Sequence, residues 1–451
     1  MHNATMKLAP LTVAEARERI AAAIDPLATE YVPIDDALDR VLARDLPAAG
    51  DVPPFASAAM DGYAVLAGPA GRTLRVIGES RAGVPSELAV AAGEAIRTST
   101  GAALPTGADA VVRQEQVETD GDEVTLCAGV AASADIRHRG EDLAAGAVVL
   151  ARGTRLGVPE LAGAVAAGAS GLWCARRPRV AILCTGTELR APGEPLGPGE
   201  IHNANAVTLR ALATRCGATT APPQRLVDDR AAIETALAGA LESADVVIVT
   251  GGVSVGPHDH VKPALEALGV EQNFWGVAIQ PGKPTWFGTF AGPGTGTRSD
   301  TSRDVGRQAG PGSEALGPRD VGRQANSQGS LGLQGRPKLP VFGLPGNPVA
   351  AFVAFTLFVA PALFALQGAD AGRDPGQSAE LGLAVPLNPT REQAITVRLE
   401  HDGGRTIAVP NGPQGSNLIS SLLGADALGM IPAGTGRLEA GADLALIPLP
   451  R

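Results

Sequence analysis

The stretch DVVIVTGGVSVGPHDH, residues 245–260, decides how the middle of this chain folds. It opens with a short run of β-branched apolar residues, which is typical of a strand buried on both faces of a parallel sheet. The run ends at Gly251 and Gly252, where the chain can turn sharply. Helical periodicity follows over residues 260–269, so the stretch predicts a strand, a glycine turn and a helix.

The same alternation of strand and helix extends to both sides of this stretch. Apolar runs that predict further strands lie at residues 179–186, 225–227, 273–279, 285–290 and 339–344. Segments with helical periodicity separate most of these runs. Strands that alternate with helices predict a doubly wound, parallel α/β sheet over residues 179–370.

The sequences on both sides of this α/β region have the composition of β structure. The predicted fold class is therefore multidomain, with one α/β domain and further β domains. Short Val, Ile and Leu runs between Gly, Pro and Asp predict a small β-rich domain at residues 46–145 and a C-terminal β-barrel at residues 371–451. Near the N-terminus, Thr12 and Glu15 form a capping box that predicts a helix.

Residues 291–338 differ from everything around them. They are rich in Gly, Ser, Arg, Gln and Pro, and the heptapeptide RDVGRQA occurs twice, at 303–309 and 319–325. Such a composition buries too little apolar surface to offset the entropy of ordering, so we expect a disordered insertion in the α/β domain. The repeat is explained by duplication within low complexity or, alternatively, by a docking motif.

Composition excludes some classes of partner. The net charge is −10, aromatic residues make up 3%, and no basic block exists, so nucleic acid is not an expected partner. The four cysteines are scattered without a C-x-x-C pair, which suits a reducing cytoplasm and argues against structural zinc. The first ten residues have no signal-peptide pattern.

The segment at residues 349–366 is apolar enough to be a membrane-helix candidate, because its only polar residue is Thr356. Against this interpretation, no Lys or Arg flanks it closely and Pro361 interrupts it. We therefore expect a helix buried inside the protein and no membrane association.

Polar residues and glycines follow five predicted strands at the point where each strand ends. In an open parallel sheet these ends meet at one edge, which is where ligands bind. The residues that this rule gathers are Thr185, Glu188, Asp228, Asp229, Gly251, Gly252, Ser254, Gly256, Asp259, Gln280, Lys283, Pro345, Gly346 and Asn347. The set predicts an anionic or phosphate ligand and metal-assisted chemistry.

Several of these residues have a structural alternative. Asp229 and Asn347 precede helices and would serve as N-caps, whereas Asp228 is one residue too early for that role. Glu188 would favour the dipole of a nearby helix start. Neither a P-loop nor a dinucleotide-binding fingerprint is present.

At this point the motifs resemble those of a known family, the molybdopterin molybdenumtransferases of the bacterial MoeA type, related to the E-domain of gephyrin. The resemblance rests on stretches in family order that cover nearly the whole chain outside the insertion. They are PPFASAAMDGYAV (53–65), STGAALPTGADAVVRQE (99–115), RHRGEDLAAG (137–146), TGTEL (185–189), TGGVSVGPHD (250–259), PGKPTWFG (281–288), GLPGNPVAAF (343–352) and PQGSNLISSLLGADAL (413–428).

The resemblance implies an elongated subunit of four parts that forms a homodimer, with residues 7–45 and 146–178 as a discontinuous linking domain. It implies molybdenum insertion into adenylylated molybdopterin, using molybdate and releasing AMP, with Mg²⁺ as the divalent cation. Molybdopterin adenylyltransferase and apo-molybdoenzymes become possible partners. The alternatives are a catalytically weak molybdopterin-binding carrier or scaffold, and a related hydrolase of another nucleotide.

Site roles carry over from the family motif by motif. Catalytic positions implied are Asp61, Asp142, Glu188, Asp228, Asp259 and Lys283, of which Glu188, Asp228 and Asp259 are also implied metal ligands. Substrate-binding positions implied are Thr185, Gly251, Gly252, Ser254, Gly256, Pro284, Pro345, Gly346, Asn347, Arg391 and Ser416.

This chain departs from the family pattern where basic residues are common. Gln280 and Gly276 stand at two such positions, which predicts weaker oxyanion binding unless another cation compensates. His258 and His260 match no family ligand and diverge at a helix start, so we expect both to be solvated.

Overall fold

The structure is a computed structural model that describes residues 10–253, 259–292, 338–369 and 376–449. The chain divides into two compact units, each described below by itself. Unit 1 comprises Met1–Asp25, Pro178–Leu363 and Ala371–Arg451, and unit 2 comprises Pro26–Arg177 and Phe364–Asp370. The predicted insertion falls almost entirely at residues 293–337, outside the described residues.

A seven-stranded sheet forms the centre of the α/β domain of unit 1. Its strands are β13 (Arg179–Thr185), β16 (Thr219–Thr220), β17 (Gln224–Leu226), β18 (Val246–Thr250), β19 (Glu271–Trp275), β21 (Trp286–Phe290) and β22 (Leu339–Leu344). The order is β16-β13-β18-β22-β21-β19, with β17 beside β13 on the β16 side. Five strands run parallel, as predicted, and the α/β fold class is confirmed.

The direction of β21 corrects the prediction of a wholly parallel sheet. β21 pairs antiparallel with both β22 and β19, and Trp286 lies opposite Gly343 near the end of β22. Strand β21 therefore starts at the edge where the parallel strands end. Gln280 and Lys283 precede it, so they still belong to the predicted edge.

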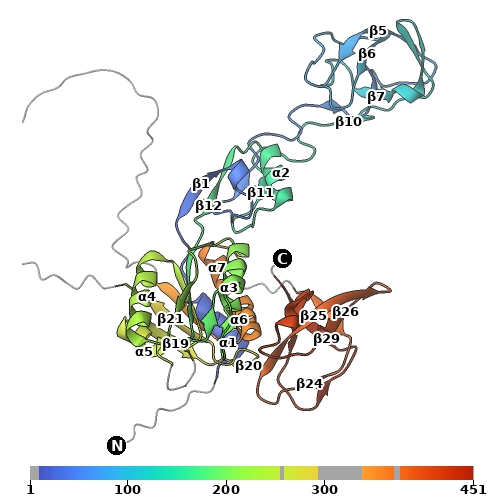
Figure 1. Ribbon diagram of the computed structural model, residues 1–451. Helices are drawn as coiled ribbons and strands as arrows, with labels where there is room; N and C mark the ends of the chain where they lie inside the picture. The colour runs from blue at the N-terminus through green and yellow to red at the C-terminus, as the bar shows by residue number, and fades with distance from the viewer. Residues whose placement is uncertain (1–9, 254–258, 293–337, 370–375, 450–451) are drawn as a thin grey trace, which may run out of the picture. The chain divides into compact units, whose positions relative to one another are not determined.

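Helices cover both faces of this sheet (Figure 1). One face carries α4 (Arg230–Ser243) and α5 (Val261–Ala267), which pack with the sheet in a core that includes Leu237, Val249 and Leu265. The other face carries α3 (Ala204–Arg215) and a long helix built from α6 (Pro348–Ala354), η3 (Phe355–Val359) and α7 (Ala360–Leu366).

The long helix is buried, as predicted. The segment Pro348–Leu366 is long and apolar enough to cross a membrane, but 78% of its most apolar window is buried inside the protein. Its middle turn, η3, is a π-helix. Pro361 follows this turn and has no N–H to donate to the carbonyl of residue 357, which explains a change of helical register here.

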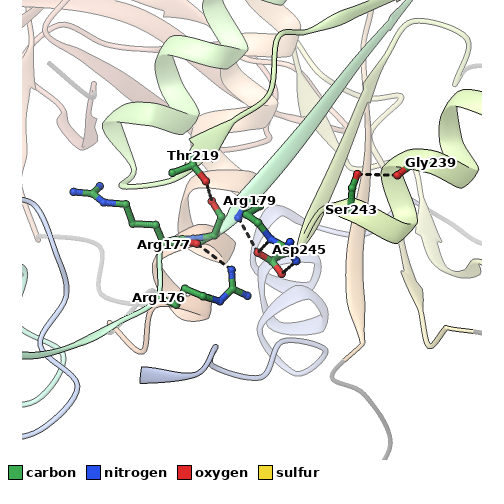
Figure 2. Close-up of polar contacts among 8 residues, drawn as sticks. Arg176, Arg177, Arg179, Thr219, Gly239, Ser243 and Asp245 are labelled. Atoms are coloured by element: carbon green, nitrogen blue, oxygen red, sulfur yellow. Dashed lines mark hydrogen bonds and ion pairs between the residues drawn. The ribbon is translucent and has the colours of Figure 1, made fainter. Parts of the chain in front are cut away.

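The opposite edge of the sheet, where β13 begins, is held by an ion pair (Figure 2). The Arg179 guanidinium binds the Asp245 carboxylate through two hydrogen bonds of 3.1 Å, and the backbone N–H of Arg179 donates to the same carboxylate. Thr219 donates to the carbonyl of Pro178 through both its N–H and its hydroxyl. These contacts fix the strands at the edge away from the predicted site.

The C-terminal part of unit 1 is a closed barrel, which confirms that prediction. Its strands are β23 (Ser378–Leu381), β25 (Glu392–Asp402), β26 (Arg405–Pro410), β27 (Ala427–Ile431) and β29 (Asp443–Pro448). They pair in the order β25-β26-β23-β29-β27, and β27 returns to pair with β25. A short strand of the α/β domain, β20 (Ile279–Gln280), adds to β25 and so joins the two parts of unit 1.

Unit 2 has two apolar cores. A six-stranded sheet surrounds one of them and is built from β4 (Gly62–Val65), β5 (Thr73–Ser80), β6 (Glu94–Thr98), β7 (Ala110–Arg113), β8 (Val117–Asp120) and β9 (Glu123–Leu126). The other core lies between α2 (Val158–Ala166) and two antiparallel strand pairs. These are β1 (Thr29–Pro33) with β12 (Gly171–Ala175), and β2 (Leu46–Pro47) with β11 (Val148–Leu150).

The first helix, α1 (Val13–Ala21), has the predicted capping box of Thr12 and Glu15. By its contacts, α1 belongs to unit 1. Leu11 forms a bridge with Val277, and Arg19 donates to the carbonyl of Asn273. These long-range contacts are not visible in local sequence.

Candidate active site

The sheet of unit 1 has a switch point beside its first strand, β13. From β13 the chain passes to β17 on one side and then returns to β18 on the other. The loops that follow β13 and β18 therefore leave in opposite directions and open a crevice between them, which is where doubly wound sheets bind ligands.

A cleft of about 660 Å³ lies at this switch point, and we call it the switch-point cleft. Its lining comes from the loops that the sequence singled out, together with the start of α3 and two residues of the barrel domain. The lining residues are Thr185, Gly186, Glu188, Leu189, Ile201, His202, Asn203, Ala204, Asn205, Asp228, Thr250, Gly251, Gly252, Asp259, Pro284, Pro345, Gly346, Asn347, Pro348, Asn417 and Ile419.

The glycine turn after β18 lies directly against neighbouring backbone. Gly251 and Gly252 have positive φ angles of 84° and 63°. A Cβ atom on Gly251 would lie 2.5 Å from the Thr185 carbonyl oxygen, and one on Gly252 would lie 2.9 Å from a Val261 methyl group. Gly346, from the loop after β22, packs against Gly251. Only glycine permits this approach, which brings the backbone of the turn to the wall of the cleft. The Gly251 N–H donates to the Leu344 carbonyl at 3.3 Å.

A buried amide joins the ends of these strands. Asn205, in the first turn of α3, donates to the Thr250 hydroxyl at 3.0 Å and to the Gly346 carbonyl at 2.7 Å. The Thr250 hydroxyl donates in turn to the Pro345 carbonyl at 2.8 Å. Sequence reasoning missed Asn205. The signal available was an asparagine in the first turn of a predicted helix, beyond its capping position.

Three carboxylates line the switch-point cleft, those of Glu188, Asp228 and Asp259. Asp228 accepts hydrogen bonds from the N–H and the hydroxyl of Thr187, at 3.2 and 3.1 Å. Glu188 lies in the loop between β13 and β14 (Leu189–Arg190) and not at a helix start, which corrects the dipole alternative. No Lys or Arg is among the described residues that line this cleft, so the cleft is acidic.

The donor set fits a Mg²⁺ ion that a substrate helps to hold. Mg²⁺ binds carboxylate oxygens, keeps several waters, and is usually held by one or two carboxylates together with phosphate oxygens. Within the described part of the chain, no three His, Cys, Asp or Glu side chains gather closely enough to hold a metal by themselves. The assignment of Glu188, Asp228 and Asp259 as metal ligands therefore stays a prediction, in which substrate oxygens complete the site.

A second cavity, of about 360 Å³, adjoins the cleft, and we call it the lysine pocket. It shares Pro284, Pro345 and Asn347 with the switch-point cleft. Its other lining residues come from the turn before β21, the start of the long helix and the barrel. They are Gln280, Pro281, Gly282, Lys283, Val349, Ala350, Arg391, Gln393, Ala394, Ile395, Gln414, Gly415 and Ser416.

The lysine pocket is cationic. Lys283 and Arg391 both line it, and no Asp or Glu is among the described lining residues. The turn that carries Lys283 is fixed by its backbone, because Val277 N–H donates to the Lys283 carbonyl at 3.0 Å. Ser416 joins the pocket from the barrel, so the structure brings together the three side chains predicted to meet an oxyanion.

Amide side chains occupy much of the remaining wall of this pocket. Asn388 donates to the Gln280 side-chain oxygen at 2.7 Å, which leaves the Gln280 amide nitrogen as the group able to donate to a ligand. The side-chain oxygen of Gln393 is buried and has no hydrogen-bond partner in the described structure. Gln393 was not predicted. A buried polar atom without a partner beside a cavity indicates a place for a ligand or for water.

Asn347 behaves differently from the predicted helix cap. It stands at the N-cap position of α6 but makes no capping hydrogen bond. Its side chain donates instead to the Ser416 hydroxyl of the barrel at 3.0 Å. Asp229 does cap α4 by accepting from Ala232 N–H at 2.8 Å, which confirms that prediction.

Lys262 is a further cation near the glycine turn that sequence reasoning missed. Its ammonium nitrogen lies 4.9 Å from the centre of the Trp275 ring, and the Trp275 indole donates to the Val253 carbonyl at 3.1 Å. Burial lowers the pKa of Lys262, while the Asp259 carboxylate opposes that shift. Through Trp275, these contacts fix Val253, the residue that directly follows the glycine turn.

The remaining predicted residues lie in unit 2, outside the described residues, or at the start of α5. Asp61 and Asp142 belong to unit 2, where Asp61 accepts from the N–H and hydroxyl of Thr100 at 2.7 and 2.9 Å. These two hydrogen bonds lower the pKa of Asp61. Ser254, Gly256 and His258 lie outside the described residues, and His260 is half-buried at the start of α5.

Three family models match the chain in order. The MoeA N-terminal region (domain I and II) matches residues 11–168, the probable molybdopterin binding domain matches residues 181–365, and the MoeA C-terminal region (domain IV) matches residues 378–449. The match to the probable molybdopterin binding domain covers the central sheet and the glycine turn. It also covers those walls of the switch-point cleft and of the lysine pocket that come from the α/β domain.

Curated relatives match over nearly the full length. The molybdopterin molybdenumtransferase of Haemophilus influenzae is 31% identical over 446 residues, covering 97% of this chain and 98% of that protein. Molybdopterin molybdenumtransferase 2 of Mycobacterium tuberculosis is 32% identical over 427 residues, covering 92% of this chain and 93% of that protein.

Solved structures agree with this match. Two crystal structures of the molybdopterin biosynthesis MoeA protein of Pyrococcus horikoshii superpose with TM-scores of 0.72 and 0.74, each at 29% identity. They cover 98% and 97% of this chain. The fold and the site thus define a transferase built around a molybdopterin-binding α/β domain. The chain belongs to the MoeA family of molybdopterin molybdenumtransferases, which places it in molybdenum cofactor biosynthesis.

Proposed function

We propose that this chain inserts molybdenum into adenylylated molybdopterin, using molybdate and releasing AMP. The observation that carries the proposal is the contact between two cavities of opposite charge in a member of this family. The acidic switch-point cleft and the cationic lysine pocket share Pro284, Pro345 and Asn347. An anhydride held by a cation and an oxyanion held by the protein would therefore meet at one place.

The switch-point cleft suits the phosphoanhydride of the substrate. Its backbone donors, at Gly252 and Gly346, would face phosphate oxygens, because the Gly251 N–H already donates to the Leu344 carbonyl. Thr185 adds a hydroxyl at the same edge. Negative phosphates cannot enter beside three carboxylates unless a cation neutralises them. Mg²⁺ held by Asp228, Asp259 or Glu188 would supply that neutralisation and polarise the anhydride.

The lysine pocket suits molybdate. Lys283 and Arg391 would pair with its two negative charges, and Ser416 and the Gln280 amide would donate hydrogen bonds to its oxygens. The adjoining cleft would place the dithiolene sulfurs of the pterin next to the metal. Formation of the Mo–S bonds releases one molybdate oxygen as water, which carries the two thiol protons.

In the adenylylated substrate, the bond that breaks joins phosphorus to the bridging oxygen of the anhydride. Water supplies the oxygen of the new P–OH group, and AMP and molybdopterin phosphate separate. Asp61 and Asp142 of unit 2 are proposed catalytic residues through the family resemblance. The described chain assigns no proton transfer to either of them.

The test is a turnover assay with purified protein, adenylylated molybdopterin, molybdate and Mg²⁺. We expect molybdate-dependent release of AMP and a product that reconstitutes an apo-molybdoenzyme. Absence of AMP release would overturn the proposal.

One observation favours a second candidate, a pterin-binding carrier with weak catalysis. Gln280, a neutral residue, lines the lysine pocket at a position where the family resemblance leads one to expect a basic residue. A carrier would bind the pterin tightly and release no AMP on addition of molybdate. The same assay, run beside a pterin-binding measurement, separates the two candidates.

We also propose a homodimer in the cytoplasm that receives its substrate from molybdopterin adenylyltransferase and delivers cofactor to apo-molybdoenzymes. Support comes from the family resemblance; on unit 2, Phe55 and Met60 are exposed apolar side chains that the interface would cover. Small-angle scattering should give the mass of two chains, and a single-chain mass would contradict the dimer.

A further inference from the structure

The loop that carries Asp142, residues 138–145, is closed at both ends by strand pairing, and we call it the Asp142 loop. At one end β10 (Ile136–Arg137) pairs antiparallel with β3 (Ser57–Ala58). At the other end the chain forms an antiparallel bridge back to Val52. The loop therefore projects from between two antiparallel pairings within unit 2.

The backbone in the middle of the Asp142 loop is bonded to the neighbouring segment of unit 2. Gly140 N–H donates to the Pro53 carbonyl at 2.9 Å. The N–H groups of Asp142 and Leu143 both donate to the Val52 carbonyl, at 2.9 and 3.1 Å. These bonds fix the backbone of Asp142 itself, and the two flanks of the loop are held by a side chain.

That side chain is Asp51, whose carboxylate binds both flanks of the Asp142 loop. Its Oδ2 atom accepts from the Arg139 Nε at 2.6 Å, and its Oδ1 atom accepts from the Ala145 N–H at 2.8 Å. The Ala145 N–H and the Arg139 guanidinium lower the pKa of Asp51, so the carboxylate is ionised at neutral pH. One carboxylate thus ties together two residues that lie on opposite sides of Asp142 in the chain.

Gly140 shows how closely the loop packs against Asp51. Its φ angle is 72°, and a Cβ atom at this position would lie 3.2 Å from the Asp51 Oδ1 atom. The Asp51 side chain is accordingly only 21% exposed. A typical surface ion pair joins two exposed side chains and contributes little, whereas Asp51 is packed under a loop and binds its backbone.

The Asp142 side chain differs from its surroundings. It is exposed and makes no hydrogen bond or ion pair with the part of the chain that the structure describes. Asp61, the other proposed catalytic residue of unit 2, is held directly by Thr100. Among the described residues, the position of the Asp142 carboxylate therefore depends on its loop, and functional groups need such support from the residues behind them.

We propose that Asp51 is a positioning residue for the reaction, because it holds the Asp142 loop and so keeps the Asp142 carboxylate in one place on unit 2. The role of Asp142 in turnover rests on the proposed function, whereas the hold of Asp51 on the loop does not. Asp51 acts through Arg139 and Ala145 and touches no substrate. A loosened loop should lower kcat and leave substrate binding nearly unchanged, since reacting groups tolerate little displacement.

The first test compares Asp51→Ala with wild type in the assay of AMP release. The kcat value should fall roughly 10- to 100-fold, and KM for the adenylylated substrate should stay within about twofold. Asp51→Asn should restore part of the loss, because its amide oxygen can still accept from the Ala145 N–H. An unchanged kcat in Asp51→Ala would overturn the proposal.

Glu94→Ala is the matched control, because Glu94 is another carboxylate of unit 2 that bridges an arginine and a backbone group. It accepts from Arg75 at 2.9 Å and from the Ala91 N–H at 3.3 Å, and its side chain is 24% exposed. Thermal unfolding should show both variants folded, and Glu94→Ala should keep kcat within about twofold of wild type. If Glu94→Ala lowered kcat as much as Asp51→Ala, the effect would be one of general stability and the positioning role would fall.

A double variant tests whether Asp51 acts through Asp142. When Asp51→Ala is added to Asp142→Asn, turnover should fall by no more than about a further twofold, because the positioned group is already lost. A further loss of about tenfold would show that the two residues act independently, and it would overturn the positioning role.

Amide hydrogen exchange on the full chain separates this proposal from the proposed function. In Asp51→Ala the N–H groups of the Asp142 loop should exchange at least about tenfold faster than in wild type, and in Glu94→Ala they should not change. Equal exchange in wild type and Asp51→Ala would overturn the proposal even if AMP is released. If exchange accelerates but wild type releases no AMP, the hold of Asp51 on the loop stands, and the proposed function fails together with the role in turnover.

Discussion

The switch-point cleft and the lysine pocket adjoin one another and have opposite charges. The cleft is lined by Glu188, Asp228 and Asp259, whereas the pocket is lined by Lys283 and Arg391. Both would receive anions under the proposed function. In that case the cleft would need a divalent cation to accept a phosphate, and the pocket would supply its own positive charge for molybdate.

This difference shows how one edge of a sheet could keep two anionic substrates apart. A phosphate that entered the lysine pocket would block molybdate, and molybdate in the cleft would be repelled by the carboxylates. Under the proposed function, the opposite charges on the two sides of Pro284, Pro345 and Asn347 would separate a ligand that brings a metal from one that does not. The following experiments change one side at a time.

The largest effect is expected on the acidic side, from Asp259→Asn. Loss of this carboxylate should lower turnover on the order of 10²–10³-fold, because a metal that neutralises the anhydride contributes several kcal/mol. AMP release measures the effect. Molybdate affinity should stay within about twofold of wild type, because the pocket does not use Asp259. An unchanged rate would remove Asp259 from the mechanism.

The next effect is expected on the cationic side, from Lys283→Ala. Molybdate affinity should fall roughly 10- to 100-fold, which corresponds to one lost hydrogen bond to a charged group. Lys338→Ala is the matched control, since Lys338 is exposed just before β22 begins. Calorimetry with molybdate measures both variants. Equal losses in the two variants would show a general charge effect and no specific site.

Removal of the divalent cation should separate the two cavities directly. With chelator present, affinity for the adenylylated substrate should fall at least about tenfold, because the phosphates then face unneutralised carboxylates. Molybdate binding should change by less than about twofold. The distinction between the cavities would be lost if molybdate binding needed Mg²⁺ to the same degree.

A smaller effect is expected when charge is added to the lysine pocket by Gln280→Lys. A lysine here should raise molybdate affinity by a few-fold, and the gain should shrink as salt concentration rises. Gln280→Glu should act in the opposite direction. If AMP release rises with Gln280→Lys, the natural site is a weakened enzyme site; if affinity rises and no turnover follows, the carrier interpretation gains support.

The sequence predicted the acidic side well because local signals sufficed there. Apolar runs located the parallel strands, and the rule that their ends share an edge gathered Asp228, Gly251 and Gly346. Asp228 was distinguished from the capping residue Asp229 by a single position in the chain. The structure bears out that distinction through the Thr187 and Ala232 hydrogen bonds.

The cationic side was harder to predict because it is built from distant segments. Arg391 and Ser416 come from the C-terminal part of unit 1, and the stretch around Arg391, residues 388–400, carries only a loose resemblance. Nothing local reveals that Asn347 donates to Ser416 in place of capping its helix, since a tertiary partner competes with the cap. The antiparallel direction of β21 is likewise set by its neighbours and not by its own residues.

The smallest effect on activity is expected from Asp229, next to the cleft residue Asp228. Asp229→Ala should lower the free energy of unfolding by about 1 kcal/mol, because it removes the hydrogen bond to Ala232 N–H that caps α4. Asp229→Asn keeps a capping oxygen and should retain most of that stability. Thermal unfolding measures both variants, and AMP release should stay within about twofold of wild type. A large loss of turnover in Asp229→Asn would extend the acidic side of the site to this residue, because the two variants differ in the cap and share the lost charge.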